Sequence, residues 1–195
     1  MKRPERTLRI VAGRWRGRRF RFPAADIRPT PDRVRETLFN WLQPRIVGAR
    51  CLDLYAGSGA LGLEALSRGA AAVVFVERQR AVAEALRTLL RDWQAEGAQV
   101  ICDQARSYLA AGHRSDPDGE RFDLVFLDPP YAASRDGELP AVLARLVQGM
   151  LARDARIYVE HARSDPAPEL TGGLRQVRTG TAGEVRYHLL AATDA

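Results

Sequence analysis

From about residue 50 to the end of this 195-residue chain, short apolar runs alternate with longer segments whose apolar side chains follow helical spacing. Apolar runs of this kind, bounded by turn residues, are typical of buried strands. Strands separated by helices favour a parallel sheet with helices on both faces. Two alternating runs near the end, 174–180 and 184–191, flank a short turn and predict an antiparallel hairpin. The expected fold class is α/β, with a mostly parallel, doubly wound sheet closed by a C-terminal hairpin.

The expected elements follow from these patterns. The predicted strands are residues 51–55, 72–76, 98–102, 122–127 and 155–159. The predicted helices are residues 59–67, 79–94, a short helix ending near 111, and 139–151.

Charge is distributed unevenly between an N-terminal extension and the rest of the chain. Residues 1–50 hold 14 basic and four acidic side chains, a net charge of +10, whereas residues 51–195 hold 16 basic and 20 acidic ones, a net charge of −4. A chain of this length supports one domain. We therefore expect a single domain, with a basic β/helix extension over residues 1–45 and an α/β core over residues 46–195. The clustered positive charge predicts a polyanionic partner, most simply nucleic acid.

Within the extension, residues 14–22 alternate basic and aromatic side chains around a glycine. Strand periodicity would place Trp15 on one face and its arginine neighbours on the other. Trp15 is interpreted either as a stacking surface for a base or as a side chain that packs onto the sheet. Farther on, Thr30 is expected to cap a helix over residues 31–43, with Pro31 as its first residue. Because arginine makes bidentate phosphate contacts, the first RNA-binding candidates are Arg14, Arg16, Arg18 and Arg19.

A glycine-rich turn, Asp-Leu-Tyr-Ala-Gly-Ser-Gly-Ala-Leu-Gly over residues 53–62, lies between a predicted strand and a predicted helix. Glycine lets a ligand approach the backbone, and the helix start offers unpaired N–H groups. Glu77 ends the next strand, where a carboxylate can accept hydrogen bonds from both hydroxyls of a ribose. This pattern alone fits an NAD site or an S-adenosylmethionine site.

Asp53 favours S-adenosylmethionine, because a carboxylate can hold its ammonium group whereas a pyrophosphate gains nothing from a nearby carboxylate. The loop also resembles the first motif of class I methyltransferases, acidic-x-x-x-Gly-x-Gly. The cofactor-binding candidates are Asp53, Tyr55, Gly57, Ser58, Gly59, Glu77 and Arg78. In that fold a polar side chain after the third strand reaches the adenine amino group. Here that residue is Asp103 or Gln104, and Asp103 suits a helix cap equally well.

Residues 122–131 form an apolar strand that ends in Asp128-Pro129-Pro130-Tyr131. This ending resembles the Asp/Asn-Pro-Pro-aromatic motif of amino-group methyltransferases. An exocyclic amine is a poor nucleophile because its lone pair is delocalised into the ring. The Asp128 carboxylate and the Pro129 carbonyl can accept hydrogen bonds from its N–H groups, and Asp128 can take the released proton. Tyr131 can stack on the base. The motif alone is compatible with adenine N6, cytosine N4, guanine N2 and a glutamine amide.

Over nearly its whole length the chain resembles the RsmD-type family of bacterial 16S ribosomal RNA guanine-N2 methyltransferases. The resemblance lies in residues 9–18, 28–40, 52–69, 128–131 and 159–160. It implies S-adenosylmethionine as cofactor and one guanine N2 amine of 16S RNA, in an assembled or assembling 30S subunit, as substrate. It assigns catalysis to Asp128, Pro129, Pro130 and Tyr131. It also implies that the helix opened by Arg28, Thr30 and Arg33 lies near the mouth of the active site, which adds these three to the RNA-binding candidates.

Three alternatives are weaker. DNA adenine-N6 and cytosine-N4 methyltransferases usually carry a target-recognition insertion, and no segment here has that size. A non-catalytic RNA-binding assembly factor would not need the intact glycine loop, Glu77 and Asp128. An NAD-dependent oxidoreductase leaves the Asp-Pro-Pro-Tyr sequence unexplained.

Other residues give weaker signals. Cys51 and Cys102 lie in apolar runs and are expected to be buried free thiols, and without a Cys-x-x-Cys pair no metal site is expected. No apolar run reaches the length of a membrane span, and no secretory signal is evident. We expect a cytoplasmic monomer that has no membrane partner. Glu160 either lines the base pocket or is a surface carboxylate. The three histidines, at positions 113, 161 and 188, show no pairing pattern.

Overall fold

The computed structural model describes residues 5–23, 30–111, 121–130, 138–170 and 172–192. The chain divides into two compact units, Met1–Gln104 and Ala105–Ala195.

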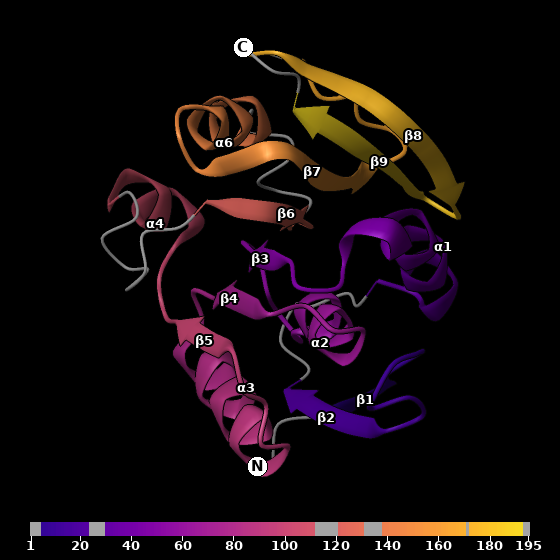
Figure 1. Ribbon diagram of the computed structural model, residues 1–195, viewed down its shortest axis with the longest axis vertical. Coiled ribbons are helices and arrows are strands. Elements are labelled where there is room, and N and C mark those ends of the chain that lie inside the picture. The colour runs from indigo at the N-terminus through magenta and orange to yellow at the C-terminus, as the bar shows by residue number, and fades with distance from the viewer. Residues whose placement is uncertain (1–4, 24–29, 112–120, 131–137, 171, 193–195) are drawn as a thin grey trace. The chain divides into compact units, whose positions relative to one another are not determined.

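The first unit contains a three-stranded parallel sheet in the order β5-β4-β3 and a separate two-stranded antiparallel ribbon of β1 and β2. The strands of the parallel sheet alternate with helices along the chain, and the ribbon lies beside α3 (Figure 1). Its elements are β1 (Glu5–Arg9), β2 (Arg19–Pro23), α1 (Asp32–Leu42), a 3-10 turn (Gln43–Arg45), β3 (Arg50–Asp53), α2 (Ala60–Ser67), β4 (Ala72–Val76), α3 (Arg80–Asp92) and β5 (Ala98–Ile101).

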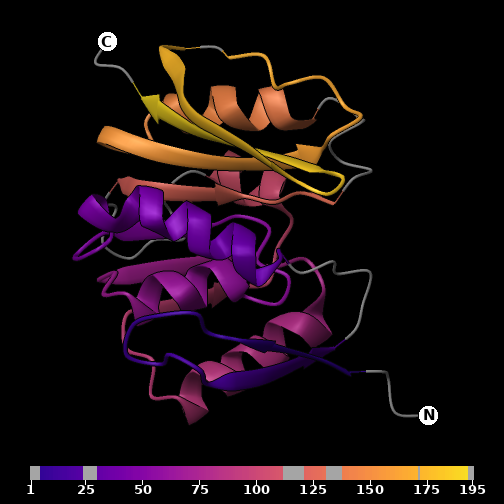
Figure 2. The same cartoon turned by 90° about the vertical axis from the view of Figure 1, so that its right-hand side faces the viewer.

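The second unit contains four strands in the order β6-β7-β9-β8. Strand β6 is parallel to β7, whereas β9 runs antiparallel to both β7 and β8. Helix α6 lies alongside these strands (Figure 2) and contacts α4. The elements are α4 (Ala105–Ala111), β6 (Phe122–Leu127), α6 (Glu138–Val147), β7 (Leu151–Ala162), β8 (Leu174–Ala182) and β9 (Val185–Ala192).

The predicted α/β class, with parallel strands separated by helices and a closing antiparallel hairpin, is confirmed. One boundary is wrong: the helix predicted over residues 139–151 ends at Val147, and β7 begins already at Leu151. Gly149 adopts a φ of +132°, which stops the helix. The apolar Met150 and Leu151 that extended the helical pattern are buried near the start of the next strand instead.

The strand periodicity expected around Trp15 is also wrong there, because residues 12–17 form turns and β2 begins only at Arg19. The backbone N–H of Arg14 donates to the carbonyl oxygen of Ser67 (2.8 Å), and that of Trp15 donates to Ser67 Oγ (3.0 Å). Gly13, at a φ of +81°, makes this approach feasible, since a Cβ there would lie 1.9 Å from the Ser67 carbonyl oxygen. Hydrogen bonds to the end of α2 thus override the alternating pattern.

Candidate functional site

The glycine-rich loop connects β3 to α2 in the first unit. Gly59 directly precedes α2 with a left-handed φ of +78°, and a Cβ there would lie 2.7 Å from Leu86 Cδ1. At Gly62, inside α2, a Cβ would lie 2.2 Å from Phe75 Cε1 on β4. The glycines therefore have separate functions: Gly59 permits the turn, and Gly62 permits close packing of α2 on the sheet.

Glu77, at the end of β4, is held against this loop. It is 7% exposed, and its two carboxylate oxygens accept hydrogen bonds from the backbone N–H groups of Gly57 (2.9 Å) and Gln79 (2.7 Å). These two bonds fix the orientation of the carboxylate. A carboxylate has about four lone-pair positions, so an oriented carboxylate of this kind can also accept hydrogen bonds from ligand hydroxyls.

Asp53, at the end of β3, lies on the other side of the loop in sequence. It is 2% exposed, and its Oδ2 accepts a hydrogen bond from the N–H of Gly62 in the first turn of α2 (3.0 Å). A carboxylate is favourable at this position because the helix N-terminus carries partial positive charge. Two carboxylates beside the loop disfavour a pyrophosphate ligand and favour a ligand with ammonium and hydroxyl groups.

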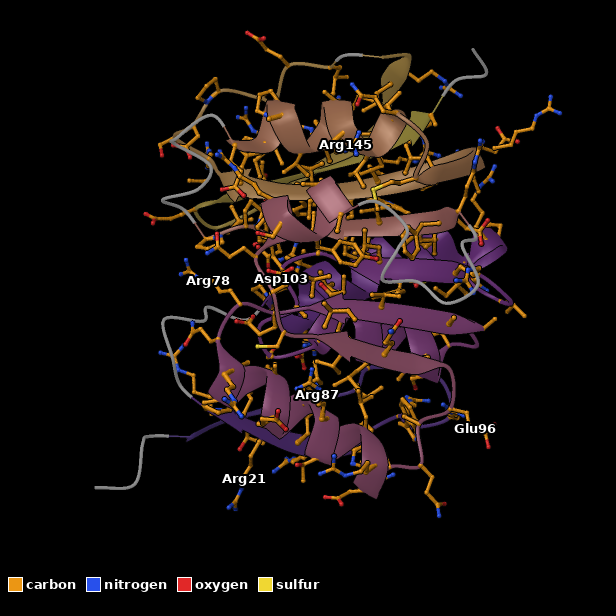
Figure 3. The ribbon with its side chains drawn as sticks, turned by 90° about the vertical axis from the view of Figure 1, so that its left-hand side faces the viewer. Arg21, Arg78, Arg87, Glu96, Asp103 and Arg145 are labelled. Carbon is orange, nitrogen blue, oxygen red and sulfur yellow. The ribbon has the colours of Figure 1, made fainter. Side chains whose placement is uncertain are left out.

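The remaining cofactor candidates differ in exposure. Ser58 is buried, Tyr55 and Asp103 are half-buried, and Arg78 and Gln104 are exposed. Arg78 and Asp103 follow the paired ends of β4 and β5, where the Glu77 N–H donates to the Ile101 carbonyl (3.0 Å), and Figure 3 shows both at this edge. Asp103 Oδ1 accepts a hydrogen bond from the N–H of Gln104 (2.7 Å), so both residues stay candidates for the adenine contact.

The N-terminal ribbon borders the same loop. A small hollow in the first unit is lined by residues of β2, the glycine loop and α3. The lining residues are Arg21, Phe22, Gly57, Ser58, Val82, Ala85, Leu86 and Leu89. The basic extension is therefore built into the surroundings of the glycine loop, a link that the sequence did not indicate.

In the second unit, the Asp-Pro-Pro sequence directly follows the buried strand β6. Asp128 is half-buried, Pro129 is buried and Pro130 is exposed, while Tyr131 lies outside the described residues. The last registered pair of β6 and β7 is Leu127 with Val159, so Asp128 comes one residue beyond it. The prolines restrict the backbone at this strand end, where they donate no hydrogen bond themselves.

The neighbouring strand β7 carries Tyr158 and Glu160 at this level. The Tyr158 hydroxyl donates to Glu160 Oε2 (2.8 Å), and Glu160 is 6% exposed, so its interpretation as a surface carboxylate is wrong. The pKa of Tyr158 lies well above its ordinary value, first because of burial and then because of the negative charges of Glu160 and Asp128. Tyr158 therefore stays protonated and remains a hydrogen-bond donor.

Trp15 belongs to the core of the first unit. It is 8% exposed, and its ring lies 5.0 Å from that of Trp93, the residue directly after α3. The guanidinium of Arg14 lies 4.1 Å from the Trp15 ring centroid, and that of Arg18 lies 4.4 Å from the Trp93 centroid. Of the two interpretations of Trp15, these contacts favour packing. The four candidate arginines of this segment, Arg14, Arg16, Arg18 and Arg19, are all exposed.

Sequence reasoning missed Glu64, which anchors the N-terminal segment to α2. Its side chain is fully buried and accepts hydrogen bonds from the backbone N–H groups of Val11 (2.8 Å) and Ala12 (2.9 Å) and from Arg68 Nε (2.9 Å). Ser67 Oγ adds a hydrogen bond to the Ala12 carbonyl (2.6 Å). The signal that was available is a lone glutamate within an otherwise apolar helix, because such a charge is tolerated only when paired.

The start of α1 also differs from prediction. The residue before the helix is Pro31 rather than Thr30, without a side-chain capping bond, so the predicted Thr30 cap is wrong. Pro31 has an extended ψ of 149°, which delays the first helical residue to Asp32. Thr30 is buried and Arg33 is exposed, whereas Arg28 lies outside the described residues.

Two histidines without a sequence signal form a pair on β7 and β9. His161 Nε2 and His188 Nε2 are 2.9 Å apart, and the rings stack with an interplanar angle of 2°. His188 Nδ1 lies 2.6 Å from Gln176 Oε1. Burial and the charges of His161 and Arg186 lower the pKa of His188 to about 4, and burial lowers that of His161. His113 lies outside the described residues.

The cysteines are both free thiols, but only Cys51 is buried; the prediction for Cys102 is wrong because it is exposed just after β5. Within the described ranges, no group of three or more His, Cys, Asp or Glu side chains could hold a metal ion. No helix in the described part of the chain is long and apolar enough to span a membrane.

Known proteins resemble this chain closely. The model of the family described as "conserved hypothetical protein 95" matches residues 8–191. The ribosomal RNA small subunit methyltransferase D of Escherichia coli K12 is 44% identical, with 97% of this chain and 94% of that protein covered. The protein of the same name from Haemophilus influenzae is 40% identical, with 89% of each chain covered.

A solved Escherichia coli structure described as a candidate methyltransferase matches 95% of this chain and 98% of its own, with 41% identity and a TM-score of 0.82. This similarity confirms the predicted class I, Rossmann-like methyltransferase fold. The family match and the two relatives agree over nearly the whole chain. The chain thus belongs to the "conserved hypothetical protein 95" family, the family of the RsmD-type small-subunit ribosomal RNA methyltransferases.

Proposed function

We propose that this protein transfers a methyl group from S-adenosylmethionine to the exocyclic N2 amine of one guanine in 16S ribosomal RNA. The observation that carries the proposal is Asp128-Pro129-Pro130 directly after the buried strand β6. The similarity to relatives named as small-subunit ribosomal RNA methyltransferases supports RNA as the substrate. As the form of the substrate we propose an assembled or assembling 30S subunit, methylated in the cytoplasm by a monomer.

The donor set beside the glycine loop fits S-adenosylmethionine. Buried Asp53 and Glu77 supply carboxylates for an ammonium group and for ribose hydroxyls, and Gly57 and Gly59 carry no side chain that would cover the backbone of the turn. Tyr55, Ser58 and Arg78 complete the proposed surroundings, with Asp103 or Gln104 at the adenine. When bound, this cofactor supplies a methyl group on a positively charged sulfur.

The Asp-Pro-Pro sequence would act on the amine. The Asp128 carboxylate and the Pro129 carbonyl accept hydrogen bonds from the two N–H groups of the amine. These hydrogen bonds orient the nitrogen lone pair toward the methyl carbon. The bound cofactor would supply the methyl group for the new C–N bond and would keep the electron pair of the broken C–S bond on its sulfur. Asp128 accepts the proton that the nitrogen then loses, directly or through a water molecule. Stacking of Tyr131 on the base stays part of the proposal.

Exposed arginines of the N-terminal segment would contact RNA phosphates. The segment brings Arg14, Arg16, Arg18 and Arg19 to the surface, and Arg33 is exposed on α1. Arg14 and Arg18 lie over tryptophan rings, which restrict their guanidinium planes. Trp15 and Thr30 are buried, so we propose that they support the arginine-bearing surface and do not contact RNA themselves. Arg28 remains a predicted RNA contact.

The test uses 30S subunits from a strain that lacks this gene, incubated with the protein and methyl-labelled S-adenosylmethionine. We expect label in the 16S RNA, recovered after nuclease digestion as N2-methylguanosine at a single position. Label in N6-methyladenosine or N4-methylcytidine would contradict the base assignment. Absence of transfer to 30S subunits and to their assembly precursors, with the protein folded, would contradict the function.

A further inference from the structure

Tyr158 and Glu160 form a hydrogen-bonded pair on β7, next to the strand that ends at Asp128. The Tyr158 hydroxyl donates to Glu160 Oε2 (2.8 Å), and both side chains are buried. Phe126 pairs with Tyr158 and Leu127 pairs with Val159 in the parallel ladder. Asp128 and Glu160 are the next residues of the two strands, so they follow this last pair side by side. The Asp128 charge also raises the pKa of the Tyr158 hydroxyl, as expected for groups that are close in space.

The burial of the Glu160 carboxylate restricts the hydrogen bonds that it can make. A carboxylate that is taken out of water loses hydration and must regain hydrogen bonds from the protein or from a ligand. Tyr158 stays protonated because burial and the neighbouring carboxylates raise its pKa, so it keeps donating to Glu160. This hydrogen bond uses one of about four lone-pair positions of the Glu160 carboxylate and fixes its direction.

Strand β9, which lies next to β7, packs Tyr187 against the Tyr158–Glu160 pair. Glu160 is paired with Tyr187 across β7 and β9, and the rings of Tyr158 and Tyr187 are 6.1 Å apart. Gly180 on β8 gives Tyr187 its room, since a Cβ there would lie 2.4 Å from Tyr187 Cζ. Glu160 is therefore held on a face with two tyrosines, which limits its rotamers.

The bases that carry an exocyclic amine differ at the adjacent ring nitrogen. Guanine has an N1–H donor beside its N2 amine, whereas adenine and cytosine each have a ring-nitrogen acceptor beside theirs. A fixed carboxylate next to the amine site would accept a hydrogen bond from guanine N1–H. In adenine or cytosine the same carboxylate would face the lone pair of a ring nitrogen, which repels it. An unmatched buried polar group of this kind gives strong discrimination.

We propose that Glu160 is a specificity-determining residue, which accepts a hydrogen bond from guanine N1–H while Asp128 and Pro129 hold the N2 amine. Tyr158 is a positioning residue that acts through Glu160. This inference rests on the proposed function and deepens it, because it assigns the choice of guanine to a particular side chain.

The experiment uses small subunits reconstituted with 16S RNA that carries either guanine or 2-aminopurine at the methylated position. 2-Aminopurine keeps the exocyclic amine but has an acceptor at N1. The proteins compared are the wild type, Glu160→Gln, Tyr158→Phe and the control Glu184→Gln, which removes an exposed glutamate from the β8–β9 turn. The measurements are kcat and KM for both subunits, cofactor affinity and melting temperature.

We expect Glu160→Gln to lower kcat/KM on guanine subunits by about 10- to 100-fold, the effect of losing a hydrogen bond to a charged group. The glutamine amide can donate to the N1 acceptor, so activity on 2-aminopurine subunits should rise relative to guanine. Tyr158→Phe should shift the guanine/2-aminopurine ratio in the same direction by a smaller factor. Cofactor affinity should stay unchanged in both variants, and Glu184→Gln should match the wild type.

The inference is overturned if folded Glu160→Gln keeps guanine activity within threefold and the wild-type ratio. If Glu160→Gln fails to fold, Tyr158→Phe decides, and an unchanged base ratio in that variant overturns the inference. Failure of the proposed function looks different, because the wild type would then not methylate guanine subunits at all.

Discussion

Two buried glutamates of the first unit, Glu64 on α2 and Glu77 at the end of β4, make similar contacts in different places. Each accepts hydrogen bonds from two backbone N–H groups: Glu64 from Val11 and Ala12, and Glu77 from Gly57 and Gln79. Glu64 also pairs with Arg68 and is fully buried, whereas Glu77 retains 7% exposure beside the glycine loop. Glu64 therefore joins two chain segments, whereas Glu77 can still bind a ligand.

The lesson is that burial and hydrogen bonding by themselves do not identify a binding residue. Glu64 satisfies N–H groups of a segment more than 50 residues away, so its effect is on folding. Glu77 lies at the carboxyl end of a parallel strand, where α/β proteins bind ligands. Variants should therefore divide into those that change stability and those that change binding or catalysis.

The largest effect is expected from Glu64→Ala. Removal of this carboxylate leaves Arg68 and two backbone amides without their acceptor, and breaking a buried ion pair typically costs about 3–5 kcal/mol. Urea unfolding should show this loss in the free energy of unfolding, while cofactor affinity of the folded fraction stays near wild type. The control is Glu84→Ala, which removes an exposed pair with Arg87 and should cost at most about 1 kcal/mol. Equal stability of the two variants would contradict a joining function for Glu64.

Asp128→Ala extends the comparison to a carboxylate proposed to act in the reaction itself. Loss of the acceptor that orients the amine should lower kcat by about 100- to 1,000-fold, similar to the loss of one oriented catalytic hydrogen bond. Calorimetric cofactor binding should remain at the wild-type value. Asp128→Asn keeps one acceptor oxygen and should retain more activity than Asp128→Ala. Turnover of the alanine variant within tenfold of wild type would refute this assignment.

The His161–His188 pair gives a stability effect that depends on pH. Because the pKa of His188 falls from 6.5 to about 4 on folding, the native state binds fewer protons than the unfolded state below pH 6.5. His188 therefore leaves the free energy of unfolding unchanged above pH 6.5 and lowers it as the pH falls from 6.5 toward 4, by up to about 3 kcal/mol. Unfolding titrations between pH 4 and 7.5 should show this slope in the wild type and a shallower one in His188→Gln. Identical slopes would exclude the pair as the source.

Glu77→Ala should weaken S-adenosylmethionine binding, because the ribose hydroxyls lose a charged acceptor worth about 1.5–3 kcal/mol. Calorimetry on the folded variant should give a dissociation constant raised by roughly 10- to 150-fold. Wild-type protein should show no heat with NAD. If Glu77→Ala binds the cofactor as tightly as the wild type does, Glu77 is not a cofactor-binding residue and does not differ from Glu64 in this respect.

The smallest effect is expected from replacing Arg16 and Arg19 together by glutamine. These exposed arginines can be changed without disturbing Arg14 and Arg18, which lie over the tryptophans. The slope of log affinity for 30S subunits against log salt should become shallower by about 0.7–0.9 for each phosphate that the variant no longer neutralises. The matched control replaces Arg175 and Arg178, two exposed arginines of β8. If both double variants change the slope equally, the N-terminal segment has no special part in RNA binding.

The docking of the N-terminal segment decides what a truncation would do. Residues 11–15 bind Glu64 and Ser67, and Trp15 and Phe20 pack on Trp93. Removal of residues 1–20 would expose these partners, so truncation would mix a stability effect with loss of charge. Charge-neutralising substitutions are therefore the better test of RNA contact.

The α/β elements, the glycine loop and the Asp-Pro-Pro strand end could all be predicted from the sequence. These features are local: strand and helix periods, the turn at Gly57 and Gly59, and the prolines after β6 each depend on neighbours along the chain. The family resemblance was also available there, since it follows from runs such as residues 28–40 and 52–69. Two errors lay at helix boundaries: Gly149 ended a helix that the apolar pattern continued, and Pro31 delayed the start of α1 by one residue.

Which segments meet could be learned only from the packing of the folded chain. Glu64 with Val11, Trp15 with Trp93, and His161 with His188 are pairs far apart in sequence, and no periodic pattern links them. Their geometry depends on how helices and strands pack, because a buried polar group settles wherever its hydrogen bonds can be satisfied. The same reason holds for Glu160, whose sequence position allowed a surface or a buried carboxylate until packing and the Tyr158 hydroxyl placed it inside.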